Sequence, residues 1–83
     1  MIVSVEISLY PMNKNYSAAI RDFIDRINRQ KGIHMKVNEM SSFLYGEYDE
    51  VMRALTEEIK ISFTQEGVII TVLKIINLDM TEQ

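Results

Sequence analysis

The chain has no cysteine and no tryptophan, and only one proline and one histidine among its 83 residues. Without cysteine, the protein can form neither a disulfide scaffold nor an iron–sulfur cluster, and it has no thiol nucleophile. A sequence free of cysteine suits a reducing compartment, so we expect a cytoplasmic protein. The lone His34 has no second histidine or cysteine to join it in a ligand set, and we expect a surface residue there.

Long apolar runs are also missing, and no stretch approaches the roughly 20 residues that a membrane-spanning helix needs. The N-terminal run MIVSVEISLY contains Glu6 and lacks both a basic start and a small-residue cleavage site. It therefore has the features of neither a membrane span nor a signal peptide. We expect no membrane partner, and the alternation of this run predicts a first strand.

Charge of one sign does not dominate the sequence. Nine lysine and arginine residues and twelve aspartate and glutamate residues are interspersed, for a formal net charge of −3. No basic stripe is present to neutralise phosphates, so we expect no nucleic-acid partner. The length predicts a single domain over residues 1–83. Because so short a chain builds a thin core, we expect self-association as a dimer or tetramer through sheet faces.

Hydrophobic periodicity divides the chain into six segments. Apolar and polar residues alternate along residues 2–10, as in a half-buried strand, and Pro11 ends the run. Apolar residues recur at helical spacing along residues 17–31, where Gly32 is the expected C-cap, and again in the segment before Gly67. The remaining segments have strand character and comprise residues 35–40, 42–46 and 68–76.

The resulting order is β-α-β-β-α-β, the split βαβ pattern. Right-handed crossovers place the first and third strands at the sheet centre, with both helices on one face. We therefore predict an α+β fold, a ferredoxin-like βαββαβ sandwich in which two helices cover one face of a four-stranded antiparallel sheet. We expect Ile7, Phe23 and Leu55 to pack between the sheet and the helix layer. The same periodicity places Arg26 on the solvent side of the first helix and leaves open whether the second helix buries Ser62 or Phe63.

The other face of the sheet is expected to stay open. On the first strand this face carries Ser4, Glu6, Ser8 and Tyr10. Glu6 is the most informative of these, because a carboxylate that is covered must be paired, protonated or bound to a ligand. Two interpretations stay open for it: Glu6 binds a ligand, or it is exposed or bonded across a subunit interface to Lys36 or Lys74.

Several chemistries that this architecture supports would leave signatures that this chain lacks. A heavy-metal carrier needs a CxxC loop, and an acylphosphatase-like site needs glycine and arginine after the first strand, where this chain has YPMNKNYS. Phe43 and Tyr45 have no basic neighbours of the kind that RNA-binding strands carry. The acidic cluster Glu47, Asp49 and Glu50 is explained by the positive end of a helix dipole. We expect no metal, no cofactor and no enzyme activity.

Three stretches, VEISLYPM, NEMSSFLYGEYDEVM and TVLKI, together resemble the thiamine-binding, YkoF-like family and cover nearly the whole chain in the right order. The family's first-strand form, SxYP, is matched by residues 8–11. Its middle form, PMGTxxEGExDEV, is matched at Met40, Gly46, Glu47, Asp49, Glu50 and Val51. Its last-strand form, TxIKI, is matched at Thr71, Lys74 and Ile75, with Leu73 replacing isoleucine.

Other positions depart from the family pattern, in the middle stretch and on either side of the last one. Glu39, Ser41 and Ser42 replace the usual Pro, Gly and Thr, so that a hydroxyl is kept at the last of these positions. At three further positions, Tyr45 replaces an acidic residue of the family pattern, Val68 replaces an arginine, and Asn77 replaces an aspartate.

The resemblance implies a ferredoxin-like protein that binds thiamine or its hydroxymethylpyrimidine part without transforming it and that associates through its sheets. An aminopyrimidine presents an acceptor nitrogen beside an amino donor, which a carboxyl or amide group can meet with two hydrogen bonds. A thiazolium is a permanent cation, which aromatic faces attract. The candidate ligand-binding residues are Glu6, Ser8, Tyr10, Asn38, Ser41, Ser42, Tyr45 and Tyr48.

A second class of function stays open at this point. A ferredoxin-like regulatory or assembly module that binds another metabolite or a protein partner would account for the departures from the family pattern. Catalysis is the weakest of the three hypotheses, because no nucleophile–base pair, metal-ligand set or phosphate loop is present in the sequence.

Overall fold

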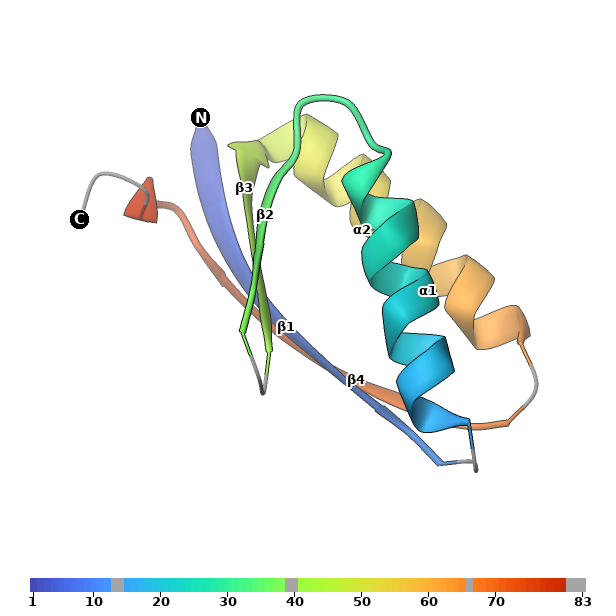
Figure 1. The fold of residues 1–83 in the computed structure, drawn as a ribbon. Coiled ribbons are helices and arrows are strands. Elements are labelled where there is room, and N and C mark those ends of the chain that lie inside the picture. Colours follow the sequence, from blue (N-terminus) through green and yellow to red (C-terminus); the bar gives the residue numbers. More distant parts are fainter. Residues whose placement is uncertain (13–14, 39–40, 66, 81–83) are drawn as a thin grey trace.

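The computed structural model describes residues 1–12, 15–38, 41–65 and 67–80. Its elements follow in the order β1 (Ile2–Pro11), α1 (Tyr16–Asn28), β2 (His34–Val37), β3 (Ser42–Glu47), α2 (Tyr48–Thr64) and β4 (Ile69–Ile76). The strands form one antiparallel sheet in the order β2-β3-β1-β4. Both helices pack on the same face of this sheet (Figure 1). The predicted α+β, ferredoxin-like sandwich is therefore confirmed.

The core lies between the helix layer and one face of the central strand β1. Val3, Val5 and Ile7 alternate along β1, and each is almost completely buried. They belong to one cluster with Phe23 of α1 and Leu55 of α2. The expected packing of Ile7, Phe23 and Leu55 between the two layers is thus confirmed, and it follows from the period of two along β1.

The boundaries of α1 and β2 differ from those predicted. α1 ends at Asn28 with Arg29 as its C-cap, so the expected C-cap at Gly32 is wrong. The backbone N–H of Gln30 donates to the carbonyl of Ile27, which tightens the last turn and directs the chain back to the sheet. Gly32 instead lies in the following turn at a φ of 78°, in the left-handed region that favours glycine. β2 is four residues long, and residues 39–40 of the predicted strand lie outside the described residues.

Gly46 is buried in β3 because another segment of backbone passes close to it. A Cβ atom at this position would lie 2.6 Å from the carbonyl oxygen of Gly32 and 3.2 Å from Cγ2 of Val51. Only glycine leaves room for both neighbours. This close approach brings the turn after α1 against the start of α2.

α2 buries two sides, one against the sheet and one against α1. Val51 and Leu55 face the sheet, whereas Glu58 and Ser62 are buried on the side of α1. The structure buries Ser62 and leaves Phe63 54% exposed, which settles the alternative that periodicity left open. No helix in the described part of the chain combines the length and apolar character needed to cross a membrane.

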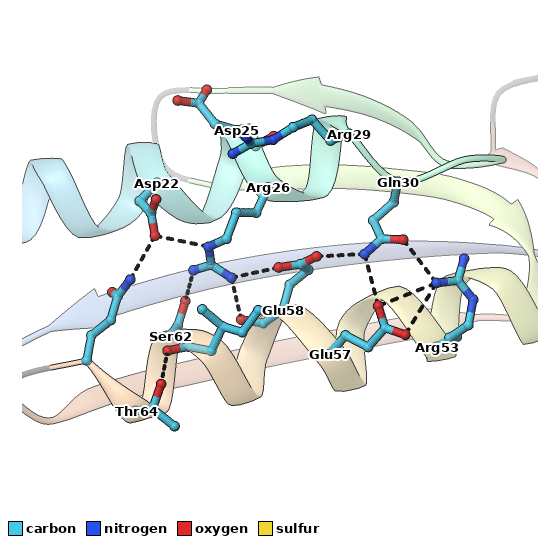
Figure 2. A network of polar contacts seen from close by, with 12 residues as sticks. Asp22, Asp25, Arg26, Arg29, Gln30, Arg53, Glu57, Glu58, Ser62 and Thr64 are labelled. Carbon is cyan, nitrogen blue, oxygen red and sulfur yellow. Dashed lines mark hydrogen bonds and ion pairs between the residues drawn. The ribbon is translucent and has the colours of Figure 1, made fainter.

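Arg26 joins the two helices, and the expectation that it faces solvent is wrong. Its Nη1 donates to the carbonyl oxygen and to Oε1 of Glu58, each at 2.8 Å, and its Nη2 donates to Oγ of Ser62 at 2.6 Å (Figure 2). The Arg26 side chain is only 12% exposed, because α2 covers this side of α1. Gln30 donates to the second Glu58 oxygen at 2.6 Å. The buried carboxylate is therefore compensated by charge and by hydrogen bonds.

Asp22 closes the outer end of this network. Hydrogen bonds from Gln65 and then from Arg26 hold the pKa of Asp22 below its ordinary value of 3.8. A depressed pKa in the folded state stabilises the fold above the unfolded pKa, and this contribution is lost as the pH falls through the folded value. Because the side chain is 45% exposed, solvent screens the contribution.

Replacing Arg26 with methionine should lower the free energy of unfolding by about 3 kcal/mol, because the Glu58 carboxylate would remain buried without its cation. Methionine at both positions 26 and 58 should recover most of that loss, since no charge is then left unpaired. Urea denaturation measures both effects. Arg53→Met is the control, because its pairs with Glu50 and Glu57 are solvent-exposed and its loss should change the free energy of unfolding far less. A double variant as unstable as Arg26→Met would contradict this account.

Candidate functional site

The open face of the sheet carries a cavity of about 320 Å3 above β3, β1 and β4. Glu6 lines this cavity and lies on the central strand, directly opposite Phe43 on β3 and directly opposite Lys74 on β4. Further residues of the lining come from three strands and from the segment after β4, and they include Ser4, Tyr45, Ile76 and Met80. A carboxylate, an ammonium group and two aromatic rings thus share one apolar hollow.

Glu6 is held only loosely by its neighbours. Its side chain is 33% exposed, and Nζ of Lys74 lies 3.5 Å from Oε1. Oγ of Ser41 donates to Oε2 at 3.4 Å. Both distances exceed the roughly 2.5–2.9 Å of a strong charge-assisted hydrogen bond, so the carboxylate keeps most of its capacity to accept. Glu6 thus pairs with Lys74 of its own chain, and a bond across a subunit interface stays a prediction.

Ser4 holds the C-terminal turn, residues 77–80, which forms one wall of the cavity. Its Oγ donates to the carbonyl oxygen of Leu78 at 2.7 Å and accepts from the backbone N–H of Met80 at 2.9 Å. Figure 1 shows the C-terminal turn beside the N-terminal end of β1. Ser4 was expected on an open surface, but this turn covers it and leaves it only 4% exposed. One end of the sheet face is therefore closed by the chain itself.

Ser4→Ala should loosen the C-terminal turn, because it removes both hydrogen bonds from one hydroxyl. Hydrogen exchange of the Met80 amide should accelerate several-fold, while the core amide of Val5 should be affected much less. The free energy of unfolding should fall by about 1–2 kcal/mol. Ser17→Ala, on the exposed side of α1, is the matched control. Unchanged protection at Met80 would show that Ser4 does not hold the turn.

The structure brings together three of the predicted ligand-binding residues. Glu6 and Tyr45 line the cavity, and Ser41 reaches Glu6. Ser8 and Tyr10 share their face of the sheet but lie farther along β1, outside the cavity lining. Asn38 is exposed beyond the end of β2, where its backbone N–H donates to the Ser41 carbonyl. Tyr48 lies at the start of α2, and its side chain is 44% exposed.

Ser42 lies on the opposite face from Glu6. It pairs with Ile7 in the register of β1 and β3, so its side chain is on the helix side, where it is 7% exposed. Ser42 and Ser41 are neighbours in sequence, but only Ser41 reaches Glu6. The structure therefore does not gather Glu6, Ser8 and Ser42 into one cluster.

Sequence reasoning did not assign Ser4, Phe43, Lys74 and Met80 to the site. Phe43 and Lys74 could have been found from the strand register, because each lies directly opposite Glu6. Met80 follows the last strand and carries no periodic signal that would place it over the sheet. Within the described residues, no group of three or more histidine, aspartate or glutamate side chains is arranged to hold a metal ion.

Three solved structures illustrate the similarity of the fold to known proteins. A protein of Streptococcus pneumoniae is 24% identical, with a TM-score of 0.86 over 98% of this chain and 91% of that chain. A candidate thiamine biosynthesis/salvage protein of Thermotoga maritima is 20% identical, with a TM-score of 0.84 over 99% and 94%. A hypothetical protein of Methanocaldococcus jannascii is 22% identical, with a TM-score of 0.80 over 95% and 82%. These likenesses show the fold.

The family is shown by the sequence itself. No curated protein matches the chain significantly. The family model described as thiamine-binding protein, however, matches residues 5–80. That range includes both helices, the C-terminal turn that walls the cavity, and all four strands apart from the first residues of β1. The chain therefore belongs to the thiamine-binding protein family.

Proposed function

We propose that the protein binds thiamine or its hydroxymethylpyrimidine part reversibly, without transforming it, in the cavity on the open face of the sheet. The observation that carries the proposal is the position of Glu6. It is a partly buried carboxylate on the central strand, it lies in a hollow beside Phe43 and Tyr45, and its two polar contacts are both long. Membership of the thiamine-binding protein family supports a ligand related to thiamine.

The chemistry of the ligand fits the groups around Glu6. The amino group of an aminopyrimidine can donate to the Glu6 carboxylate, and the hydroxyl of Ser41 can serve the adjacent polar edge. The ring itself can lie against Phe43 or Tyr45, which contribute apolar area and a favourable ring geometry. The cavity volume of about 320 Å3 is at the lower end of small-molecule sites, which span roughly 300–1,000 Å3.

The thiazolium part of thiamine meets opposing charges in this site. Glu6 and the aromatic faces attract a cation, whereas Lys74 repels it. The Lys74 side chain is 79% exposed, so it can turn into solvent and exchange its weak contact with Glu6 for hydration. Binding of thiamine would therefore replace one cation beside Glu6 by another.

Glu6→Ala should weaken binding of thiamine or hydroxymethylpyrimidine about five-fold to a hundredfold. Losing one hydrogen bond while its partner on the ligand stays unpaired costs about 1–3 kcal/mol. Calorimetric titration measures the affinity, with choline as an unrelated cation. Glu57→Ala is the matched control, because it removes an exposed carboxylate from the helix layer. Absence of heat with both thiamine-related ligands would overturn the proposal and favour a regulatory or assembly module.

Ser42→Val tests where in the fold the ligand lies. If the ligand occupies the open face, this variant should bind as the wild type does, because Ser42 faces the helices. If Ser42→Val weakens binding and Glu6→Ala does not, the site lies between the sheet and the helices, and Ser42 regains the role that the family resemblance implied for it.

Self-association through the open sheet face is the second part of the proposal. Tyr10, Ile70 and Ile76 are each about half exposed on this face, and a second subunit would cover them and enclose the ligand. Light scattering should report a dimer or tetramer at micromolar concentration. A monomer whose open face is fully hydrated would contradict it.

A further inference from the structure

The two charged side chains of the cavity are opposite in sign and adjacent to each other. Among the described residues of the lining, only Glu6 and Lys74 carry a charge. They lie directly opposite each other on β1 and β4, so their side chains leave the same face of the sheet about 5 Å apart. Nζ of Lys74 lies 3.5 Å from Oε1 of Glu6. A ligand in the cavity therefore meets a hydrogen-bond acceptor and a cation side by side.

Stability of the fold does not account for Lys74. Its side chain is 79% exposed and its contact with Glu6 is long, and exposed ion pairs of this kind stabilise a fold very little. The other residues on the same face of β4 are all apolar: Ile70, Val72 and Ile76. The one cation on this face of the strand thus lies at the cavity, and water holds it loosely enough to be exchanged for a ligand group.

A second cation lies farther along the same row of paired residues. Lys36 on β2 is opposite Phe43 on β3, and Phe43 is opposite Glu6 on β1. The row that crosses the sheet at the cavity therefore runs Lys36, Phe43, Glu6 and Lys74, with two ammonium groups and one carboxylate. The whole chain has a formal net charge of −3. This row has the opposite sign to the chain as a whole, which favours an anionic group on the ligand.

We propose that the cavity selects the phosphate ester of hydroxymethylpyrimidine over thiamine, and that Lys74 determines this selectivity. The inference rests on the proposed function and narrows its ligand class. The amino group and the methylene substituent of the pyrimidine are on adjacent ring carbons. An amino group that donates to Glu6 therefore directs the substituent to a neighbour of Glu6. In the phosphate ester this substituent is an anion that Lys74 can bind, whereas in thiamine it is a thiazolium cation that Lys74 repels.

The size of the cavity favours the same ligand. Its volume of about 320 Å3 suits one ring and a small substituent better than the two rings of thiamine. The C-terminal turn closes the cavity on one side, where Ser4 holds the backbone of Leu78 and Met80. A second ring would have to extend out of the hollow, where it would bury less apolar surface.

The expected selectivity is moderate. Hydrogen bonds between an ammonium group and a phosphate are roughly twice as strong as those between neutral groups. Solvent reaches Lys74, however, and screens its charge. We therefore expect the phosphate ester to bind about ten times more tightly than thiamine.

Calorimetric titration of the wild type and of Lys74→Met with three ligands tests the inference. The ligands are hydroxymethylpyrimidine, its phosphate ester and thiamine. Lys74→Met should weaken binding of the ester about tenfold without weakening binding of thiamine. Lys60→Met is the matched control, because it removes the same charge from an exposed position on α2, in the helix layer. This control should keep the wild-type preference.

Two further variants separate the charge of Lys74 from any structural role of its side chain. Lys74→Arg keeps the cation and should retain the preference for the ester, whereas Lys74→Glu should reverse the preference in favour of thiamine. The wild-type preference should also decline as the salt concentration rises, because salt screens exposed charges. Urea denaturation verifies that all variants are folded.

Three results would overturn the selectivity. The first is wild-type binding of the ester that is no tighter than binding of hydroxymethylpyrimidine or thiamine. The second is a preference for the ester that Lys74→Met leaves unchanged. The third is binding of inorganic phosphate as tight as that of the ester, which would indicate a contact with any anion. If hydroxymethylpyrimidine still binds and Glu6→Ala still weakens it, the proposed function stands without the selectivity. Absence of binding for all three pyrimidine ligands would overturn both.

Discussion

The position of β1 at the centre of the sheet is the constraint on which the rest of the structure depends. β1 pairs with β3 along one edge and with β4 along the other, so the face of each of its side chains is fixed from both sides. A slip of one residue would exchange Val5 and Glu6 between the core and the open face. The core and the candidate site are opposite sides of one hydrogen-bonded ladder. Burial of Val5 and Ile7 therefore determines where the Glu6 carboxylate lies.

Local patterns were sufficient to predict the element order, the faces of β1 and the burial of Phe23, because periods of 2 and 3.6 residues can be read within a short window. Arg26 shows what such patterns miss. Its position on α1 is consistent with exposure, and its partners Glu58 and Ser62 lie 32 and 36 residues away. Nothing in the local sequence indicates that α2 will cover this side of α1. Only the tertiary packing of the two helices converts an apparently solvent-exposed arginine into the ion pair that joins them.

The difference between local pattern and tertiary packing also explains which predicted site residues lie together in the structure and which do not. Glu6 was identified because a carboxylate on a central strand needs an explanation, and that argument is local. Ser42 was assigned from the family pattern, but its face depends on the pairing of β3 with β1, in which it lies opposite Ile7. Ser4 was assigned to the correct face, yet its cover comes from Leu78 and Met80, more than 70 residues away. Register and long-range closure are properties of the whole chain and cannot be read from one strand.

The cavity and one edge of the sheet share β4. Lys74 and Ile76 form one wall of the cavity, on a strand that has a neighbour on one side only. A binding site needs walls held by rigid elements, and an edge strand with one ladder is the least constrained part of a sheet. A second ladder on the far side of β4 would restrict the motion of the strand that forms this wall. A partner that ordered this wall would favour binding in the cavity as proposed above, and by reciprocity a bound ligand would favour that partner.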